Sequence, residues 1–173
     1  GAMKDYCKVI DLAPNNITAY DNRGLLKYKM GDFDGALNDY NMAIKIDPND
    51  ATAHNNRAYL YLKLNDLDKA LSDVNIAIKK DGSQHSYYET RGEIYMVMGK
   101  YEEALAEFNR SLSLFDKDKD SLMQRAKCYR HLAEKEQNKK QKSDLISKAE
   151  ADEKMVDMLN KNKKNKRTIL TNN

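Results

Sequence analysis

The chain has 173 residues, of which 33% are charged, and it contains only seven glycines and two prolines. This profile is typical of one helix-rich domain or a short repeat array. The net charge of +3 is too small to indicate a nucleic-acid or membrane partner. No apolar stretch reaches the roughly 18 residues that a membrane helix needs. A membrane partner is therefore not expected, and nucleic acid is disfavoured.

Residues 1–16 are predicted to form the second helix of an incomplete repeat, after three residues (Gly-Ala-Met) typical of a cloning remnant. Tyr6 and Pro14 lie 34 residues before Tyr40 and Pro48, so the segment is in register with a later helix. A hairpin represented by one helix leaves an apolar face uncovered. Two explanations stay open: a longer array was cut here, or this face meets a partner.

Three windows then align at a period of 34 without a gap, at 17–50, 51–84 and 85–118. Fixed columns hold small residues (Gly24, Ala58, Gly92), alanines (Ala36, Ala70, Ala104) and bulky residues (Tyr40, Val74, Phe108). Positions three or four apart share one face of a helix, so each small residue is expected to let a second helix approach closely. Each window therefore predicts a hairpin of two helices.

Turn residues recur in phase with these columns. Gly31, Asn65 and Gly99 stand where the first helix of each hairpin should end, and Gly and Asn tolerate the left-handed conformation of a helix C-cap. Asp32 and Asp66 follow at once and are predicted to cap the second helix. Agreement between caps and apolar period indicates a well-specified fold.

The third window contains Tyr88-x-x-Arg91-Gly92-x-x-Tyr95 followed by Ala104-x-x-x-Phe108. Over about residues 4–133 the chain resembles the tetratricopeptide repeat family. The resemblance implies an all-α fold, a right-handed superhelix of antiparallel helix hairpins, or TPR-like α-solenoid. Lys27 departs from the usual Tyr, and Gly82 and Asp116 depart from the usual Pro. These departures are expected to weaken single packing contacts only.

Segment 119–160 is predicted to be a modified repeat with an insertion and a long C-terminal capping helix. The polar stretch 134–142 is expected to interrupt it, with a helix resuming near Ser143. One narrow, mostly apolar side of that helix is formed by Leu145, Ala149, Asp152, Val156 and Leu159. A charged terminal helix is what a repeat array needs for solubility. Segment 161–173 is predicted to be a basic disordered tail.

The family resemblance implies a concave face lined by the first helix of each repeat. Ten residues of that face are predicted to bind a peptide: Asn22, Leu25, Tyr28, Asn55, Asn56, Tyr59, Glu89, Glu93, Met96 and Lys127. Asn side chains can bind backbone amides of an extended peptide, and Tyr is a common contact anchor.

Chaperone-binding members of the family hold a C-terminal carboxylate with two Lys, two Asn and one Arg. The matching positions in this chain hold Asp21, Leu25, Asn56, Ser86 and Thr90. Only Asn56 fits, and a buried carboxylate needs cationic, hydrogen-bonding partners. No chaperone C-terminal tail is therefore expected as a partner.

Four arginines also recur at this period: Arg23, Arg57, Arg91 and Arg125. They could form a basic ladder for phosphate. The favoured interpretation is that each aliphatic stem packs between repeats while its guanidinium pairs with a neighbouring acid.

Cysteines and histidines give no site-forming pattern. The two cysteines (Cys7 and Cys128) have no CxxC spacing and are interpreted as reduced thiols, and the three histidines (His54, His85 and His131) show no metal-ligand spacing. No cofactor and no metal are therefore expected. Two unpaired cysteines and the lack of a visible signal peptide favour the cytoplasm, although the native N-terminus is expected to lie upstream.

Catalytic motifs are missing, including the P-loop, GxSxG and HExxH patterns, so the chain is not expected to be an enzyme. The main hypothesis is a protein–protein interaction scaffold that binds a peptide segment or helix of a partner in the concave groove. One alternative is self-association through the N-terminal half-repeat or the C-terminal helix. The other is weak electrostatic RNA or anion binding through the basic tail.

Overall fold

The computed structural model describes the backbone of residues 1–171 and the side chains of residues 1–162. All regular secondary structure in that part of the chain is helical. The chain divides into two compact units, Gly1–Ser83 and Gln84–Asn173. Each unit is described separately below.

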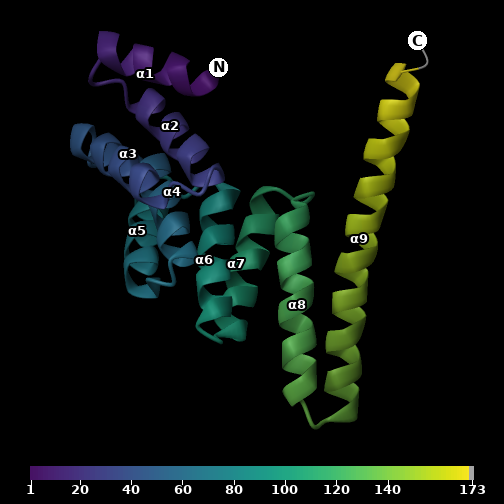
Figure 1. The fold of residues 1–173 in the computed structure, drawn as a ribbon. Coiled ribbons are helices and arrows are strands. Elements are labelled where there is room, and N and C mark those ends of the chain that lie inside the picture. Colours follow the sequence, from purple (N-terminus) through teal and green to yellow (C-terminus); the bar gives the residue numbers. More distant parts are fainter. Residues whose placement is uncertain (172–173) are drawn as a thin grey trace. The chain divides into compact units, whose positions relative to one another are not determined.

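The first unit contains a single helix followed by two hairpins (Figure 1). Its helices are α1 (Ala2–Leu12), α2 (Ile17–Lys29), α3 (Phe33–Ile46), α4 (Ala51–Lys63) and α5 (Leu67–Lys80). The pairs α2–α3 and α4–α5 form the hairpins, and α1 packs on α2. The first helices of the two hairpins, α2 and α4, also touch each other, so they form one surface of the unit.

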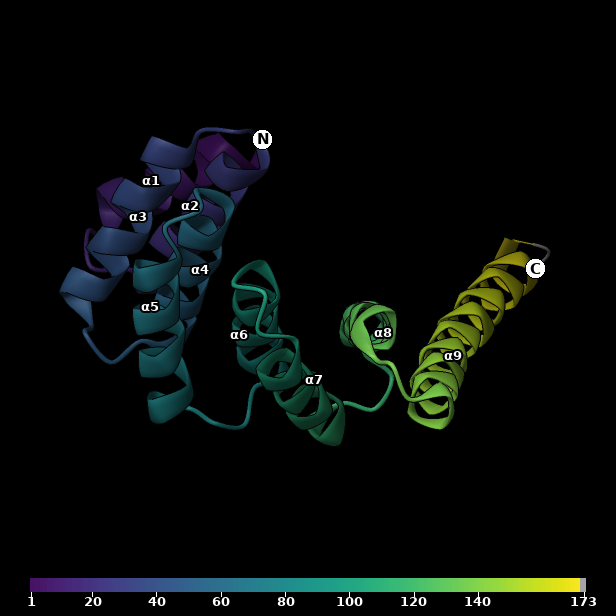
Figure 2. The ribbon, with the colours of Figure 1, turned by 90° about the horizontal axis from the view of Figure 1, so that it is seen from below.

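The second unit contains two further hairpins (Figure 2). Its helices are α6 (His85–Val97), α7 (Tyr101–Leu114), α8 (Lys119–Lys135) and α9 (Lys139–Thr171). The pairs α6–α7 and α8–α9 form the hairpins, and the first helices α6 and α8 touch as well. Helix α9 runs antiparallel alongside α8, and its C-terminal part extends well beyond the N-terminal end of α8 (Figure 1).

Small residues set the distance between the two helices of a hairpin. A Cβ atom on Gly24 would lie 2.7 Å from the ring of Tyr40, and one on Gly92 would lie 2.7 Å from the ring of Phe108. Real Cβ atoms do not approach so closely, so the predicted close contact is confirmed in both hairpins. The corresponding column of the intervening repeat has Ala58, where the bulky position holds the smaller Val74.

The predicted turn chemistry is also confirmed. Backbone φ angles are positive at Gly31 (82°), Asn65 (59°) and Gly99 (73°). The side chains of Asp32 and Asp66 accept hydrogen bonds from backbone N–H groups three residues further on, at the starts of α3 and α5. The turns therefore end one helix and start the next within a few residues.

The α8–α9 hairpin is a lengthened version of the others. In the regular hairpin α4–α5, Arg57 pairs with Asp73, 16 residues later, whereas in α8–α9 Arg125 pairs with Asp152, 27 residues later. The 11 additional residues correspond to about three helical turns. Because whole turns preserve the orientation of each face, Ala149 is fully buried at the position that Ala36, Ala70 and Ala104 hold in the regular hairpins.

The predicted interruption at 134–142 is present but much shorter than expected. Helix α8 continues to Lys135, only residues 136–138 lie outside the helices, and α9 begins at Lys139. Most of the additional residues extend the two helices, because a polar sequence still forms helix where it lies on a solvent-exposed face.

The predicted apolar side of the last helix is confirmed. Ala149, Asp152 and Val156 are buried, and Val156 packs with Leu112 and Leu122 of the preceding helices. The sequence predicted that segment 161–173 is disordered. In the structure, helix α9 continues through this segment to Thr171. Residues 172 and 173 lie outside the described residues.

Candidate peptide-binding surface

The ten predicted groove residues are divided between the two units. Six lie on α2 and α4 of the first unit: Asn22, Leu25, Tyr28, Asn55, Asn56 and Tyr59. The others lie in the second unit, with Glu89, Glu93 and Met96 on α6 and Lys127 on α8. We call the first set, together with Asp21, the α2/α4 surface.

Aromatic side chains meet on the α2/α4 surface. The ring centres of Tyr28 and Tyr59 are 5.8 Å apart and the rings meet edge to face, and the ring centre of Phe33 lies 5.7 Å from that of Tyr28. The ammonium group of Lys63 lies 4.5 Å from the centre of the Tyr59 ring. Leu25 on α2 remains exposed. These contacts hold the aromatic rings in place beside an exposed apolar side chain.

Two buried polar atoms of this surface have no hydrogen-bond partner within the described part of the chain. They are Oδ1 of Asp21 and Oδ1 of Asn55, at equivalent positions of successive repeats. A buried polar group left unpaired costs about 1–3 kcal/mol. Burial, and then the nearby Asp50, raise the pKa of Asp21 to about 7. The position of Asp21 in the repeat does not predict a buried acid, because spacing along the chain does not reveal that the side chain is enclosed.

Helix α1 contributes to the same side of the first unit. Two cavities, of about 370 Å³ and 150 Å³, lie between α1 and α2. A third cavity, of about 390 Å³, lies in the second unit. Tyr6 of α1 borders both of the α1–α2 cavities, which also reach Asn22. The predicted site did not include Tyr6, because its sequence register marks it only as a repeat-packing residue.

The corresponding surface of the second unit is acidic. Burial raises the pKa of Glu89 to about 8, with further contributions from Asp118, Glu93 and Asp120. Lys127 is exposed, and its ammonium group lies 3.0 Å from the side-chain oxygen of Gln124. Met96 packs against the buried cluster of Ala104, Phe108 and Cys128, so part of its side chain belongs to the core.

The arginine column is engaged in structural pairing, as the favoured interpretation predicted. Arg57 donates from Nε to Asp73 at 2.6 Å and from Nη2 to the second carboxylate oxygen at 2.8 Å. Its Nη1 donates to Asn41 of the preceding repeat at 2.7 Å. Arg125 makes the same set of contacts with Asp152 and Asn109. These guanidinium groups stabilise the hairpins and join neighbouring ones.

Histidines and cysteines occupy different environments. Cys7 and Cys128 are free thiols. His54 is buried, with its ring nitrogens 3.2 Å from Asp73 and 3.2 Å from the carbonyl oxygen of Pro48. His85 instead lies beside two carboxylates, a grouping able to hold a metal ion.

Two family profiles match the chain. A profile described as TPR repeat matches residues 26–65, and one described as Tetratricopeptide repeat matches residues 85–118. The chain is a tetratricopeptide repeat protein. Tetratricopeptide repeats act in protein–protein interaction and typically form non-enzymatic scaffolds, and the all-α, TPR-like solenoid predicted from sequence is the observed fold class.

Solved structures support the repeat fold. A crystal structure of MamA superposes with a TM-score of 0.71 at 19% identity, covering 89% of this chain and 88% of that one. The first repeat domain of Spaghetti (RPAP3), bound to the HSP90 peptide SRMEEVD, gives 0.64 at 27% identity, covering 68% and 93%. YrrB, described as a TPR protein with an unusual peptide-binding site, gives 0.66 at 15% identity, covering 90% and 97%.

No curated protein sequence matches the chain. Among the described residues, no helix is both long and apolar enough to cross a membrane.

Proposed function

We propose that this tetratricopeptide repeat protein binds an extended segment or helix of a partner protein on the α2/α4 surface. The observation that carries the proposal is the unpartnered, buried Asn55 carbonyl oxygen, which lies on α4 one turn before Tyr59 of the Tyr28–Tyr59 ring pair. A backbone N–H of a bound segment would satisfy that oxygen and remove the cost of leaving it unpaired. The two rings would hold an apolar side chain of the same segment.

Charge favours a partner segment without a terminal acidic cluster. The RPAP3 domain is bound to the acidic HSP90 peptide SRMEEVD, but this chain has Asp21 and Leu25 where clamp members carry Lys and Asn. A carboxylate placed beside Asp21 and Asp50 would meet like charge in a partly dehydrated site. The proposed ligand is therefore a neutral or basic segment, not a chaperone tail.

Site-specific photocrosslinking tests this placement. A photoreactive amino acid at Tyr59 should crosslink one discrete partner from native lysate, and the same group at Ser72, exposed on α5, should not. Asn55→Ala in the Tyr59-labelled chain should weaken that crosslink at least severalfold. Equal crosslinking from both positions, or no effect of Asn55→Ala, would place partner binding elsewhere.

Self-association through α1 is a second candidate, favoured by one observation. None of the residues of α1 is buried, and its apolar side chains Val9 and Leu12 are 38% and 77% exposed. A second copy could cover them. Light scattering between micromolar and millimolar concentration decides the matter, since a constant monomer mass excludes this candidate.

The third candidate is weak electrostatic binding of RNA or another anion by the basic tail, residues 161–173. Most of its side chains lie outside the described residues. This candidate predicts binding with a steep salt dependence that is lost on deletion of 160–173.

A further inference from the structure

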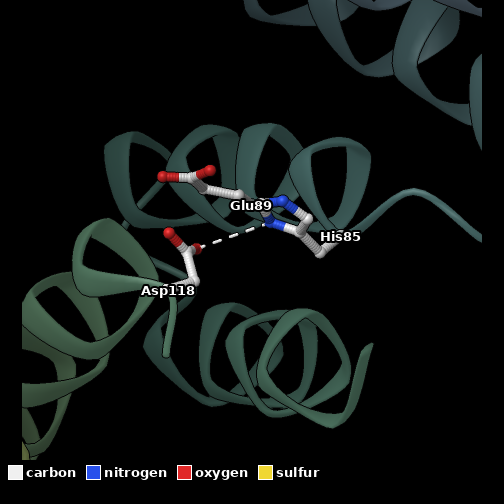
Figure 3. Close-up of side chains that lie close together, drawn as sticks. All are labelled: His85, Glu89 and Asp118. Carbon is white, nitrogen blue, oxygen red and sulfur yellow. Dashed lines mark ion pairs between the residues drawn. The ribbon is translucent and has the colours of Figure 1, made fainter. Parts of the chain in front are cut away.

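Three potential metal ligands converge in the second unit. His85 and Glu89 lie one turn apart on α6, and Asp118 stands immediately before α8 (Figure 3). One nitrogen or oxygen atom from each of the three lies within 4.8 Å of the others. Nδ1 of His85 and Oδ2 of Asp118 are 3.7 Å apart. The spacing of four between His85 and Glu89 places both side chains on one face of the helix.

The imidazole of His85 has an unsatisfied nitrogen at this point. Its Nδ1 atom is buried and has no hydrogen-bond partner in the described part of the chain, and Asp118 lies beyond hydrogen-bond distance. The ring of Phe115 packs against the imidazole, with 5.1 Å between the two ring centres. Asp118 itself is only 8% exposed and caps α8 by accepting from the backbone N–H of Ser121. A buried nitrogen without a hydrogen-bond partner thus lies at ion-pair distance from a buried carboxylate (Figure 3).

Negative charge accumulates around the same point. Glu93, one turn beyond Glu89 on α6, and Asp120, two residues after Asp118, bring further carboxylates to this part of the unit. Carboxylates gathered in a partly buried place repel one another, and a bound cation relieves that repulsion.

The repeat architecture does not require these residues. The equivalent positions of the first repeat hold Ile17, Asp21 and Asp50, so the two acids recur there without an imidazole. Those of the second repeat hold Ala51, Asn55 and Gln84. The full set of one imidazole and two carboxylates is therefore particular to the third repeat, although the fold of the hairpin is the same.

We propose that His85, Glu89 and Asp118 bind one divalent transition-metal ion, with Zn²⁺ as the preferred occupant. The imidazole favours Zn²⁺ over Mg²⁺ or Ca²⁺, which prefer oxygen-only ligand sets. Ligand atoms about 2.0–2.2 Å from a tetrahedral ion lie about 3.4 Å apart, so small side-chain rotations close the observed grouping. Three protein ligands leave the fourth position to water or to a group from a binding partner.

Isothermal titration of the full chain with ZnCl₂ tests the proposal. The expected result is saturable binding of one ion per chain, with affinity reduced at least about tenfold by His85→Ala and by Glu89→Gln. Asp118→Asn should weaken binding while retaining the cap, since Asn is an equally good N-cap residue. Circular dichroism establishes that each variant is folded.

His131→Ala is the matched control, because it removes a histidine of the same unit that pairs with Glu134 and stacks on Tyr101 outside the grouping. It should bind Zn²⁺ as the unaltered chain does. Zn²⁺ should also raise the thermal unfolding temperature of the unaltered chain and of His131→Ala, and leave that of folded His85→Ala unchanged. Absence of binding, or equal affinity after His85→Ala, overturns the proposal; the latter would place the ion at residues outside this grouping.

Discussion

Arg125 donates two hydrogen bonds, of 2.8 and 2.6 Å, to the carboxylate of Asp152, which lies 27 residues further along the chain. This pair fastens α9 onto α8 in the same way that shorter-range pairs fasten the regular hairpins. Asp152 is buried, so its removal leaves a half-buried guanidinium without its main partner.

Asp152→Ala is expected to destabilise the second unit by about 3 kcal/mol, since an uncompensated buried charge costs about that much. Glu153→Ala provides the control. Glu153 pairs just as closely with Arg130, at 2.7 Å, but both side chains are more than a third exposed, so water screens the attraction and little stability should be lost. Urea unfolding of both variants measures the difference. Similar losses for the two would show that burial does not decide the strength of these pairs.

Gly92→Ala is expected to destabilise the chain because the added methyl group would lie 2.7 Å from the ring of Phe108. Overpacking of this kind costs about 1–3 kcal/mol, partly offset by the better helix propensity of Ala. In a Phe108→Val background, which reproduces the Ala58 and Val74 combination of the second repeat, the same change should be neutral or stabilising. A double-mutant cycle by chemical denaturation gives the coupling energy, and strict additivity would contradict the steric explanation.

Asp21→Asn is expected to change how stability depends on pH. The pKa of Asp21 rises from 3.8 in the unfolded chain to about 7 in the folded one. The folded chain holds the Asp21 proton more tightly than the unfolded chain does. Its contribution to the free energy of unfolding is therefore fully present below about pH 4 and is lost as pH rises through 7. Relative to the unaltered chain, Asp21→Asn should gain on the order of 2 kcal/mol between pH 5 and pH 8. Urea midpoints at both values test this, with Asp34→Asn, an exposed change on α3, as the control; parallel profiles would be inconsistent with the raised pKa.

Asn65→Gly is expected to stabilise the first unit by up to about 1 kcal/mol. Asn65 has a φ of 59°, a left-handed conformation that costs a residue with a side chain about 1–2 kcal/mol and costs glycine little. Asn65→Ala should be neutral to destabilising for the same reason. Thermal unfolding of the two variants should move in opposite directions, and a loss of stability with Gly would mean that the Asn65 side chain has a further role.

Much of the fold could be predicted from particular residues. Columns such as Gly24 with Tyr40 encode a close helix contact, and Gly31 and Asp32 encode the end of one helix and the start of the next. These signals are local or recur at a fixed period, so one sequence reveals them. The 11 additional residues of the last hairpin were misread because their polar composition suggests a loop, whereas their length, three whole helical turns, preserves helix pairing.

The candidate sites were less accessible to sequence reasoning. The groove residues followed from the repeat register, yet the burial of Asp21 and the unsatisfied oxygen of Asn55 depend on which side chains from α2 and α4 enclose them. The grouping of His85 with Asp118 depends on the approach of two segments separated by a full repeat. The sequence by itself determined the hairpins, their caps and the register of their cores, because these rest on spacing along single helices. Only the tertiary structure decided which polar atoms are buried without partners, because dehydration and the convergence of charges arise when separate helices pack together.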